Sequence, residues 1–154
     1  MTMPDDDILS LESFLPYRLN RLAEAVSRKF SANYKARYGL TRPEWRTLAT
    51  LGQFSVMRAT EIAQHSSMHK TKVSRAVAEL ERRKWLKRTP DANDRRLEHL
   101  SLTPSGIKAY RDLLPIAREF ESRFLDDLNT QEKQGILQAL TLLERAAGLS
   151  ERRP

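Results

Sequence analysis

Apolar residues near the N-terminus recur at every third or fourth position, the spacing that places them on one face of an α-helix. The stripe consists of Leu11, Leu15, Leu19, Leu22, Val26, Phe30 and Tyr34. We expect one long amphipathic helix that ends at Gly39, with Pro16 either in its first turn or at a kink. Such a stripe faces the core in an ordinary domain. A helix of this length beside a small domain also predicts a partner helix, for example from a second subunit.

Three shorter helices are predicted in the next part of the chain. Thr41 is a suitable N-cap for a helix over residues 42–51, which Gly52 should close. A short helix over residues 58–65 follows, and Ser67 is the expected cap of a basic helix that starts one residue later. Because so few residues separate these last two helices, the pattern predicts a helix-turn-helix, in which the second helix enters the major groove of DNA.

Two short strands are predicted over residues 85–89 and 96–102, where apolar and polar residues alternate. The residues between them, 90–95, are rich in Pro, Asp and Asn, which favour a turn. This hairpin would form a wing whose basic tip can approach a phosphate track or the minor groove. Asp94 cannot face phosphate favourably, so we expect it to pair with a neighbouring Arg and fix the shape of the wing.

The helical period returns after the hairpin. Thr103, followed by Pro, is a typical N-cap, and the apolar stripe predicts a helix to about residue 128 with a bend at Pro115. Residues 129–132 resemble a capping box for a last helix, which Gly148 should end.

The predicted fold is therefore mainly α with a small β-hairpin (α+β). It comprises a winged helix-turn-helix domain over residues 41–102, an N-terminal dimerisation helix over 1–40 and C-terminal dimerisation helices over 103–154. The helices outside the winged unit have apolar faces to bury, and packing against a symmetric copy would bury them. A two-fold homodimer also places two recognition helices about one DNA turn apart, on the order of 34 Å, which suits a palindromic operator.

The charge pattern makes DNA the expected partner. The chain has 154 residues, a net charge of +7 and a pI near 10. Residues 68–96 contain ten Lys and Arg against four Asp and Glu, so most of the excess charge lies on the basic helix and the hairpin. Double-stranded DNA carries a negative charge roughly every 1.7 Å and would bind such a segment.

Residues on the outer face of the basic helix and on the wing are the candidates for DNA contact. Groove contacts come mostly from the first turns of a recognition helix, and Arg bidentate to guanine is the commonest specific contact. A solvated charged face is the alternative, but Glu79 and Glu81 appear only in the second half of the helix. The candidates are Ser67, His69, Lys70, Thr71, Lys72, Ser74, Arg75, Arg88, Asp94, Arg95 and Arg96.

Other classes of function fit the sequence less well. Five scattered glycines form no phosphate-binding loop, and no nucleophile with a base or pair of carboxylates suggests an enzyme. The inward residues of the basic helix are too small for a membrane-surface helix, and Trp85 is the only aromatic residue in the basic stretch, whereas RNA recognition uses several. A nucleic-acid-binding or architectural protein without ligand response remains an alternative.

We expect no metal, no other cofactor and no membrane partner. There is no cysteine, and the three histidines, His65, His69 and His99, are not accompanied by enough neighbouring carboxylates for a zinc site. The N-terminus is acidic, unlike a signal peptide, and no apolar run approaches the ~18 residues that a spanning helix needs. These features predict a cytoplasmic protein.

The middle of the sequence resembles the MarR (multiple antibiotic resistance regulator) family of winged-helix transcription factors. The matching segments are Leu40-Thr41-Arg42-Pro43-Glu44-Trp45, Val73-Ser74-Arg75, Leu80-Glu81-Arg82-Arg83, Asp94-Arg95-Arg96 and Leu100-Ser101-Leu102-Thr103-Pro104-Ser105-Gly106. The last two, at their spacing, are the most specific. Two residues depart from the family pattern. Lys84 stands where the family commonly has Gly at the helix end, so we expect that C-cap to be either strained or shifted, and Lys72 replaces a small hydroxyl residue.

The resemblance implies an obligate homodimer whose DNA binding is controlled by a small molecule. Family members are usually repressors, released when a phenolic or other aromatic acid, or a thioester of one, binds between the dimerisation helices and the DNA-binding lobe. The family's wing arginine maps to Arg95 or Arg96 and its structural aspartate to Asp94. Cations and aromatic residues where the first, second and fifth helices should converge are the effector-site candidates: Arg18, Tyr38, Trp45, Arg46, His65 and Arg111.

Overall fold

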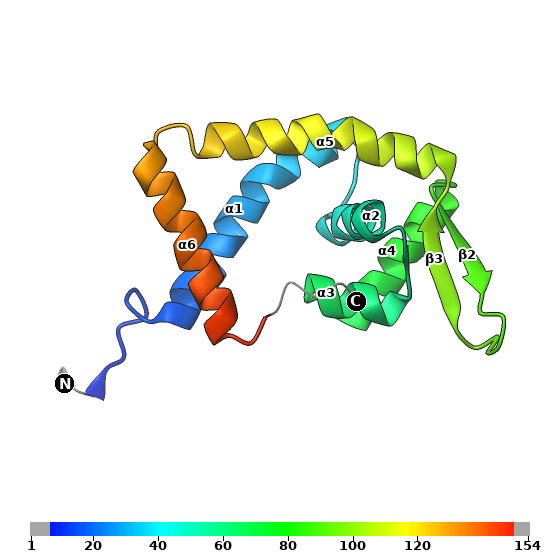
Figure 1. Ribbon diagram of the computed structural model, residues 1–154, viewed down its shortest axis with the longest axis horizontal. Helices are drawn as coiled ribbons and strands as arrows, with labels where there is room; N and C mark the ends of the chain where they lie inside the picture. The colour runs from blue at the N-terminus through cyan, green and yellow to red at the C-terminus, as the bar shows by residue number, and fades with distance from the viewer. Residues whose placement is uncertain (1–6, 150–154) are drawn as a thin grey trace. The chain divides into compact units, whose positions relative to one another are not determined.

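The computed structural model describes residues 7–149 and shows six helices with one small antiparallel sheet (Figure 1). The elements are α1 (Leu15–Tyr38), α2 (Arg42–Phe54), β1 (Val56–Met57), α3 (Ala59–Ser66), α4 (Lys70–Arg82), β2 (Leu86–Pro90), β3 (Glu98–Leu102), α5 (Pro104–Phe124) and α6 (Thr130–Ala146). They group into two compact units, one up to Gly39 and one from Leu40 onward. None of the described helices combines the length and apolar character needed to cross a bilayer.

The first unit is the single long helix α1. Pro16 lies in the first turn of the helix, so of the two alternatives, a helix start and a kink, the helix start is observed. Gly39 ends the helix with φ of 66°, a left-handed conformation in which its N–H donates to the Lys35 carbonyl. Tyr34 is buried and packs edge-on against Phe30, with ring centroids 5.3 Å apart. The apolar residues of the first turns are exposed instead, Leu22 by 59%.

The core of the second unit is formed where α2, α3 and α4 pack on one another and on the sheet. Each helix contributes one apolar stripe, as the 3.6-residue period predicts. The apolar side chains with at most 3% exposure in these elements are Leu48, Leu51, Met57, Ile62, Val73, Ala76, Val77, Leu80, Leu86 and Leu100. Fully burying each Leu, Ile or Val side chain contributes roughly 1.5–3 kcal/mol, so this cluster holds the three helices and the sheet in one arrangement.

Helix α2 is longer than the sequence predicts. Thr41 caps it as expected, but Gly52 does not close it and the helix continues to Phe54. A Cβ at Gly52 would lie 2.5 Å from ring carbons of Tyr110. The glycine is therefore explained by close packing of an α5 ring on the helix backbone, a tertiary contact that cannot be read from sequence.

The turn between α3 and α4 also differs from the prediction. Ser67 does not cap α4 but ends α3, in a left-handed conformation with φ of 53°. The Met68 N–H donates to the Ala63 carbonyl, as in a Schellman motif. The N-cap of α4 is His69, whose Nδ1 accepts a hydrogen bond from the Thr71 N–H at 3.2 Å. Helix α4 consequently starts two residues later than expected.

The sheet has three strands in the order β1-β3-β2, one more than predicted. The predicted hairpin is present, with Leu86 opposite Leu102 and Arg88 opposite Leu100. The additional strand β1 has only two residues, with Val56 opposite Ser101. A strand this short leaves no alternating pattern to detect, and its pairing to the far edge of the hairpin is decided by the position of α2.

Helix α5 starts at the predicted cap and closes the winged unit. The Thr103 side chain accepts from the Gly106 N–H and donates to the Lys84 carbonyl. A Cβ at Gly106 would lie 2.0 Å from the Trp85 carbonyl oxygen, so only glycine allows α5 to approach the start of β2 this closely. The helix ends at Phe124, earlier than the predicted residue 128, and Pro115 lies inside it.

Helix α6 is an amphipathic helix that buries none of its residues in the single chain. The predicted capping box is confirmed: Asn129 Oδ1 accepts from the Glu132 N–H at 2.8 Å, and Glu132 accepts from the Asn129 N–H. Gly148 follows the helix with φ of 78°. Exposed apolar side chains include Leu137 at 64% and Leu140 at 45%. Residues 150–154 lie outside the described residues.

Lys84, at the end of α4, adopts φ of 63°, a left-handed conformation that is strained for a residue other than glycine. Of the two outcomes expected for this cap, a strained residue or a shifted helix end, the first is observed. The flanking hydrogen bonds require this conformation. The Lys84 N–H donates to the Glu81 carbonyl and the Trp85 N–H donates to the Leu80 carbonyl, which turns the chain from α4 into β2.

We predict that Lys84→Gly raises the free energy of unfolding by about 1 kcal/mol, because a side chain in the left-handed region costs about 1–2 kcal/mol and glycine's greater freedom in the unfolded chain offsets part of the gain. Urea unfolding measures the change. Lys108→Gly, the same substitution in the exposed interior of α5, should instead lower stability by about 1 kcal/mol. A loss of stability in both variants would contradict the prediction.

Candidate nucleic-acid interface

Helix α4 separates an apolar inner face from a cationic outer face. Val73, Ala76, Val77 and Leu80 are at most 2% exposed, which fixes the rotation of the helix about its axis. The remaining residues of its first half are exposed, namely Lys70, Thr71, Lys72, Ser74 and Arg75, together with His69 and Ser67 before it. The structure therefore brings this part of the predicted DNA-contact set onto one surface.

The cations at the start of α4 are not neutralised. Within residues 7–149, no salt bridge joins Lys70, Lys72 or Arg75 to a carboxylate. Their charge is available to an external anion, and the N-terminal end of the helix dipole adds partial positive charge in the same place. Backbone phosphates of DNA match this combination.

The wing is shaped by two aspartates. Asp91 Oδ2 accepts from the N–H groups of Asn93 and Asp94 at 3.0 Å, and its Oδ1 lies 2.7 Å from His99 Nε2. Contact with His99 and these N–H groups lowers the pKa of Asp91. These contacts hold the loop as a defined turn across the end of the hairpin.

Asp94 pairs with a neighbouring arginine, as the sequence predicts. Its carboxylate accepts from the Nε and NH2 groups of Arg96, each at 3.1 Å, and from the Arg96 N–H. This side-chain hydrogen bond lowers the pKa of Asp94. Arg95 is exposed and forms no ion pair among the described residues. The two candidate wing arginines thus differ: Arg96 is held at the loop and Arg95 is available.

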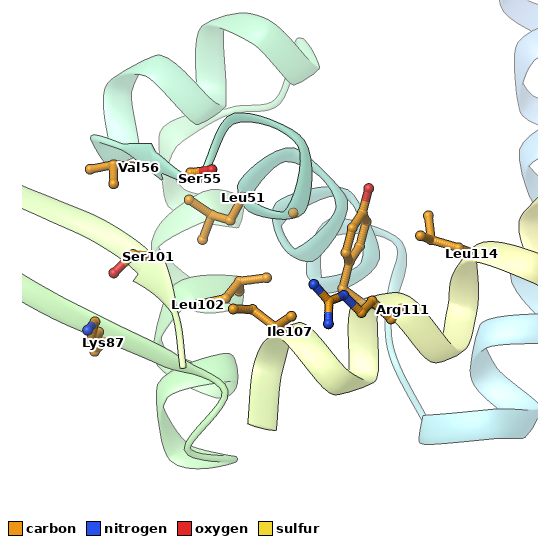
Figure 2. Close-up of a pocket in the computed structure, with 11 residues that line it drawn as sticks. Leu51, Ser55, Val56, Lys87, Ser101, Leu102, Ile107, Arg111 and Leu114 are labelled. Atoms are coloured by element: carbon orange, nitrogen blue, oxygen red, sulfur yellow. The ribbon is translucent and has the colours of Figure 1, made fainter. Parts of the chain in front are cut away.

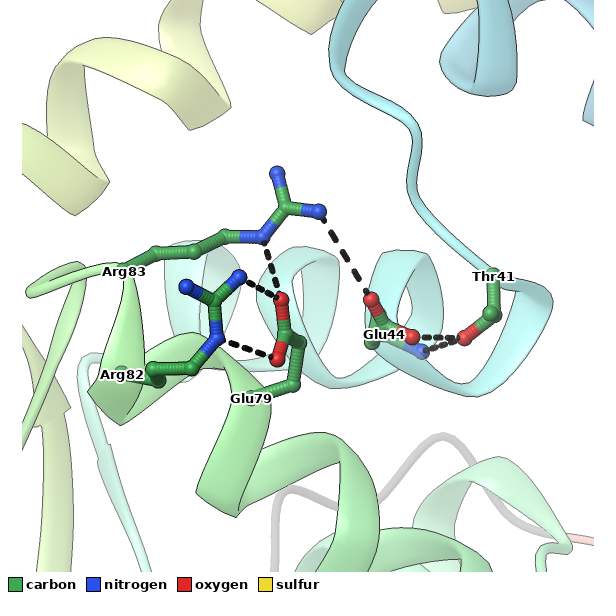
Figure 3. Close-up of polar contacts among 5 residues, drawn as sticks. All are labelled: Thr41, Glu44, Glu79, Arg82 and Arg83. Atoms are coloured by element: carbon green, nitrogen blue, oxygen red, sulfur yellow. Dashed lines mark hydrogen bonds and ion pairs between the residues drawn. The ribbon is translucent and has the colours of Figure 1, made fainter.

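A second charge network lies at the other end of α4, shown in Figure 3. Glu79 accepts two hydrogen bonds from Arg82, at 2.6 and 2.8 Å, and one from Arg83 Nε at 3.1 Å. Arg83 also lies 4.0 Å from the largely buried Glu44 at the start of α2 and stacks over Trp85. The hydrogen bonds from Arg82 and then Arg83 lower the pKa of Glu79 to about 2. This network joins α4 to α2, and Arg82 and Arg83 are bound within the protein.

Arg88, another predicted DNA contact, is bonded to two carboxylates. Its Nε lies 3.2 Å from both oxygens of Glu81 on α4, and its NH1 lies 3.2 Å from Glu98 on β3. A DNA role for Arg88 remains a sequence prediction, but it would compete with these two ion pairs.

A pocket of about 500 Å³ lies between α2, the sheet and α5 (Figure 2). Its floor is apolar, and two cations lie at its edge, Lys87 from β2 and the predicted effector residue Arg111 from α5. Tyr110 adds an aromatic ring and a hydroxyl group. Lys87 and Tyr110 are not among the predicted effector residues. Lys87 lies far from Arg111 in the sequence, and the ring of Tyr110 reaches the pocket only because α5 packs on α2. Such a mixture suits a small amphipathic anion.

A second pocket, of about 250 Å³, lies between α2 and α3 and brings together three predicted effector residues, Trp45, Arg46 and His65. Arg18 and Tyr38 belong to α1 and line neither pocket. The six predicted effector residues are therefore divided among α1, the α2–α3 pocket and the α5 pocket. No group of three or more potential metal-ligating side chains occurs within residues 7–149.

A winged helix-turn-helix with an unneutralised cationic recognition helix defines a DNA-binding protein. The sequence model of the MarR family matches residues 38–97, and the similar structures include MarR-family transcriptional regulators. The resemblance expected from the sequence is confirmed. These findings support a DNA-binding transcriptional regulator, and the relatives are named as HTH-type transcriptional regulators or as a transcriptional repressor.

Two relatives show how far the sequence similarity extends. YwaE of Bacillus subtilis (strain 168), an uncharacterized HTH-type transcriptional regulator, is 26% identical over 133 residues, which cover 86% of this chain and 77% of YwaE. The transcriptional repressor MprA of Escherichia coli (strain K12) is 32% identical over 82 residues, which cover 53% of this chain and 47% of MprA.

Solved structures confirm the fold. A MarR/EmrR family transcriptional regulator from Acinetobacter sp. ADP1 superposes with a TM-score of 0.79 and 25% identity, over 91% of this chain and 99% of that chain. S. aureus MepR in its DNA complex gives a TM-score of 0.75 at 24% identity, over 86% and 98% of the two chains. The DNA binding of Bordetella bronchiseptica BpsR is regulated by 6-hydroxynicotinic acid. Its structure gives a TM-score of 0.75 at 20% identity, over 89% of this chain and 97% of that chain.

We predict that Glu79→Gln lowers stability at pH 7 and that this difference disappears at low pH. Because the pKa of Glu79 is depressed to about 2 by Arg82 and Arg83, its contribution is complete above about pH 4.5 and is lost as the pH falls toward 2. Thermal unfolding of both proteins between pH 2 and 7 measures this. Glu119→Gln, which removes a more exposed pair with Arg123, should have a smaller effect. An equal deficit at every pH would contradict the prediction.

Proposed function

We propose that the protein is a homodimeric, sequence-specific repressor that is released from its operator by a small aromatic or phenolic acid, or a thioester of one. The observation that carries the proposal is the unneutralised cationic face of α4, backed by a fully buried apolar face. MepR in complex with DNA, MprA as a repressor and BpsR with its aromatic acid support the three parts of the proposal by similarity.

The exposed apolar faces of α1 and α6 support a dimer. Leu15 and Leu22 on α1 are 49% and 59% exposed, and Leu137 and Leu142 on α6 are 64% and 51% exposed. Large apolar residues repeated along two helices are costly in water and are typical of a protein interface. A two-fold dimer would bury them and present two copies of α4 to a palindromic operator.

In DNA, we expect the first turns of α4 to lie in the major groove. Arg75 is placed to read guanine, while Lys70 and Lys72 neutralise phosphates. Ser67, His69, Thr71 and Ser74 supply shorter polar contacts on the same surface. The available Arg95 is the better candidate for minor-groove insertion, because Arg96 is held by Asp94.

The larger pocket is the proposed effector site. An aromatic ring would pack on its apolar floor and Tyr110, and a carboxylate would pair with Arg111 or Lys87. Lys87 belongs to the wing and Arg111 to α5, so a ligand that fills the pocket would contact both elements. Release follows if the ligand binds more tightly to an arrangement whose spacing of recognition helices does not fit DNA, and the shift is limited by that difference in affinity.

Arg75→Ala tests the DNA interface. We expect a loss of ~1–3 kcal/mol in binding to a duplex selected from a random pool by the wild type, with two chains bound per duplex and relaxed sequence preference at one position. Fluorescence anisotropy at fixed salt measures affinity, and Arg118→Ala on α5 is the control. An equal loss on random duplex would reassign Arg75 to phosphate. A wild-type protein that stays monomeric at micromolar concentration, or binds no duplex at low salt, would refute the proposal.

Arg111→Ala tests the effector site. With hydroxybenzoates and their thioesters as probes, we expect the concentration that releases half of the duplex to rise about tenfold in Arg111→Ala, because a charge-assisted hydrogen bond is lost. Arg46→Ala, in the smaller pocket, is the matched control and should leave that concentration unchanged. The opposite result would assign the effector to the α2–α3 pocket, and no release by any probe would refute this part of the proposal.

A further inference from the structure

We propose that Arg88 is a positioning residue: it fixes the wing to the recognition helix and does not contact DNA. This inference rests on the proposed DNA-binding function. It is based on two ion pairs of Arg88. The guanidinium group of this β2 residue pairs with Glu81 on α4 and with Glu98 on β3. Three elements meet at this one side chain.

The sheet register places Arg88 on the inner face. Leu86 and Leu102 are opposite one another and buried, and two residues along, Arg88 is opposite the buried Leu100. Because residues two apart and residues directly opposite share a face, Arg88 and Glu98 continue the row that faces α4. The outer face of β2 carries Lys87 and Thr89 instead. Arg88 therefore extends the core toward the tip of the wing, where an apolar residue would be too exposed.

The local charge balance also disfavours a phosphate contact. The guanidinium group of Arg88 is shared by two carboxylates, so the cluster of Arg88, Glu81 and Glu98 carries a net negative charge. Moving Arg88 onto a phosphate would leave both carboxylates unpaired near a polyanion, which is unfavourable. Lys70, Lys72 and Arg75 face no such competition within the described chain.

The link matters because α4 and the wing must bind neighbouring grooves at once. Apart from packing at its base around Leu86, the hairpin extends beyond the core, and its outer half has few buried side chains. A bridge from Glu81 through Arg88 to Glu98 restricts how the hairpin tilts relative to α4. Restricting this motion before binding reduces the entropy lost on forming the complex.

Arg82 provides a matched control on the same helix. It forms a bidentate pair with Glu79, three residues earlier in α4, and is 70% exposed. Since both partners belong to one helix, this pair cannot fix one element against another. Loss of Arg82 removes the same charge and a comparable ion pair without loosening the wing.

The experiment uses the whole 154-residue chain, a duplex selected by the wild type and a random-sequence duplex. Arg88→Ala should weaken selected-duplex binding about tenfold while random-duplex binding changes little, so that specificity falls. The slope of log affinity against log salt should be unchanged, because no phosphate contact is lost. Arg82→Ala should change selected binding less than threefold. A slope that becomes shallower by about one, or unchanged selected binding in Arg88→Ala, would overturn the inference.

The double variant Glu81→Gln, Glu98→Gln gives an independent test that leaves Arg88 in place. It makes the protein more positive, so electrostatics alone, or a direct contact by a freed Arg88, predicts tighter binding to both duplexes. The positioning role predicts weaker binding to the selected duplex and poorer discrimination. Tighter selected binding would overturn the inference while leaving the proposed function intact. If the wild type itself binds no duplex, the proposed function fails and this inference fails with it.

Discussion

Burial of one apolar stripe on α4 is the constraint on which the rest of the interface depends. Val73, Ala76, Val77 and Leu80 are packed against α2, α3 and the sheet, so the helix cannot rotate about its axis without exposing them. The opposite face is thereby fixed toward solvent, and it holds Lys70, Lys72, Ser74 and Arg75. Burial of the apolar face by the hydrophobic effect therefore determines which way the charged side chains of α4 point, although the effect itself is not directional.

Carboxylates then divide the cations into two groups. Carboxylates bind four of the arginines. Arg82 pairs with Glu79 within α4, whereas Arg83 and Arg88 join different elements and Arg96 shapes the wing through Asp94. The cations at the start of α4 and Arg95 are left available. Net charge alone therefore overstates the surface that a nucleic acid meets, and the position of each acidic residue decides which arginine is structural.

Helix α5 packs closely on the winged unit at two glycines, where the backbone comes within contact distance of a neighbouring group. Gly106 meets the Trp85 carbonyl, and Gly52 meets the Tyr110 ring. Together they place Tyr110 and Arg111 beside the sheet and create the larger pocket. The pocket thus spans the wing and α5, the arrangement through which occupancy by an anion could influence the wing.

The sequence by itself determined the helices, the hairpin, most caps and the cationic character of α4, because periodicity, capping residues and charge are local properties. It also supplied the family motif and the pairing of Asp94 with a neighbouring arginine, which the structure identifies as Arg96. Only the tertiary structure decided that α2 continues past Gly52, that Ser67 ends α3, that β1 joins the sheet and that Arg88 meets Glu81 and Glu98. The turn at Ser67 is set by local hydrogen bonds that compete with the predicted cap. The other three features depend on contacts between different elements, which exist only after the core has packed.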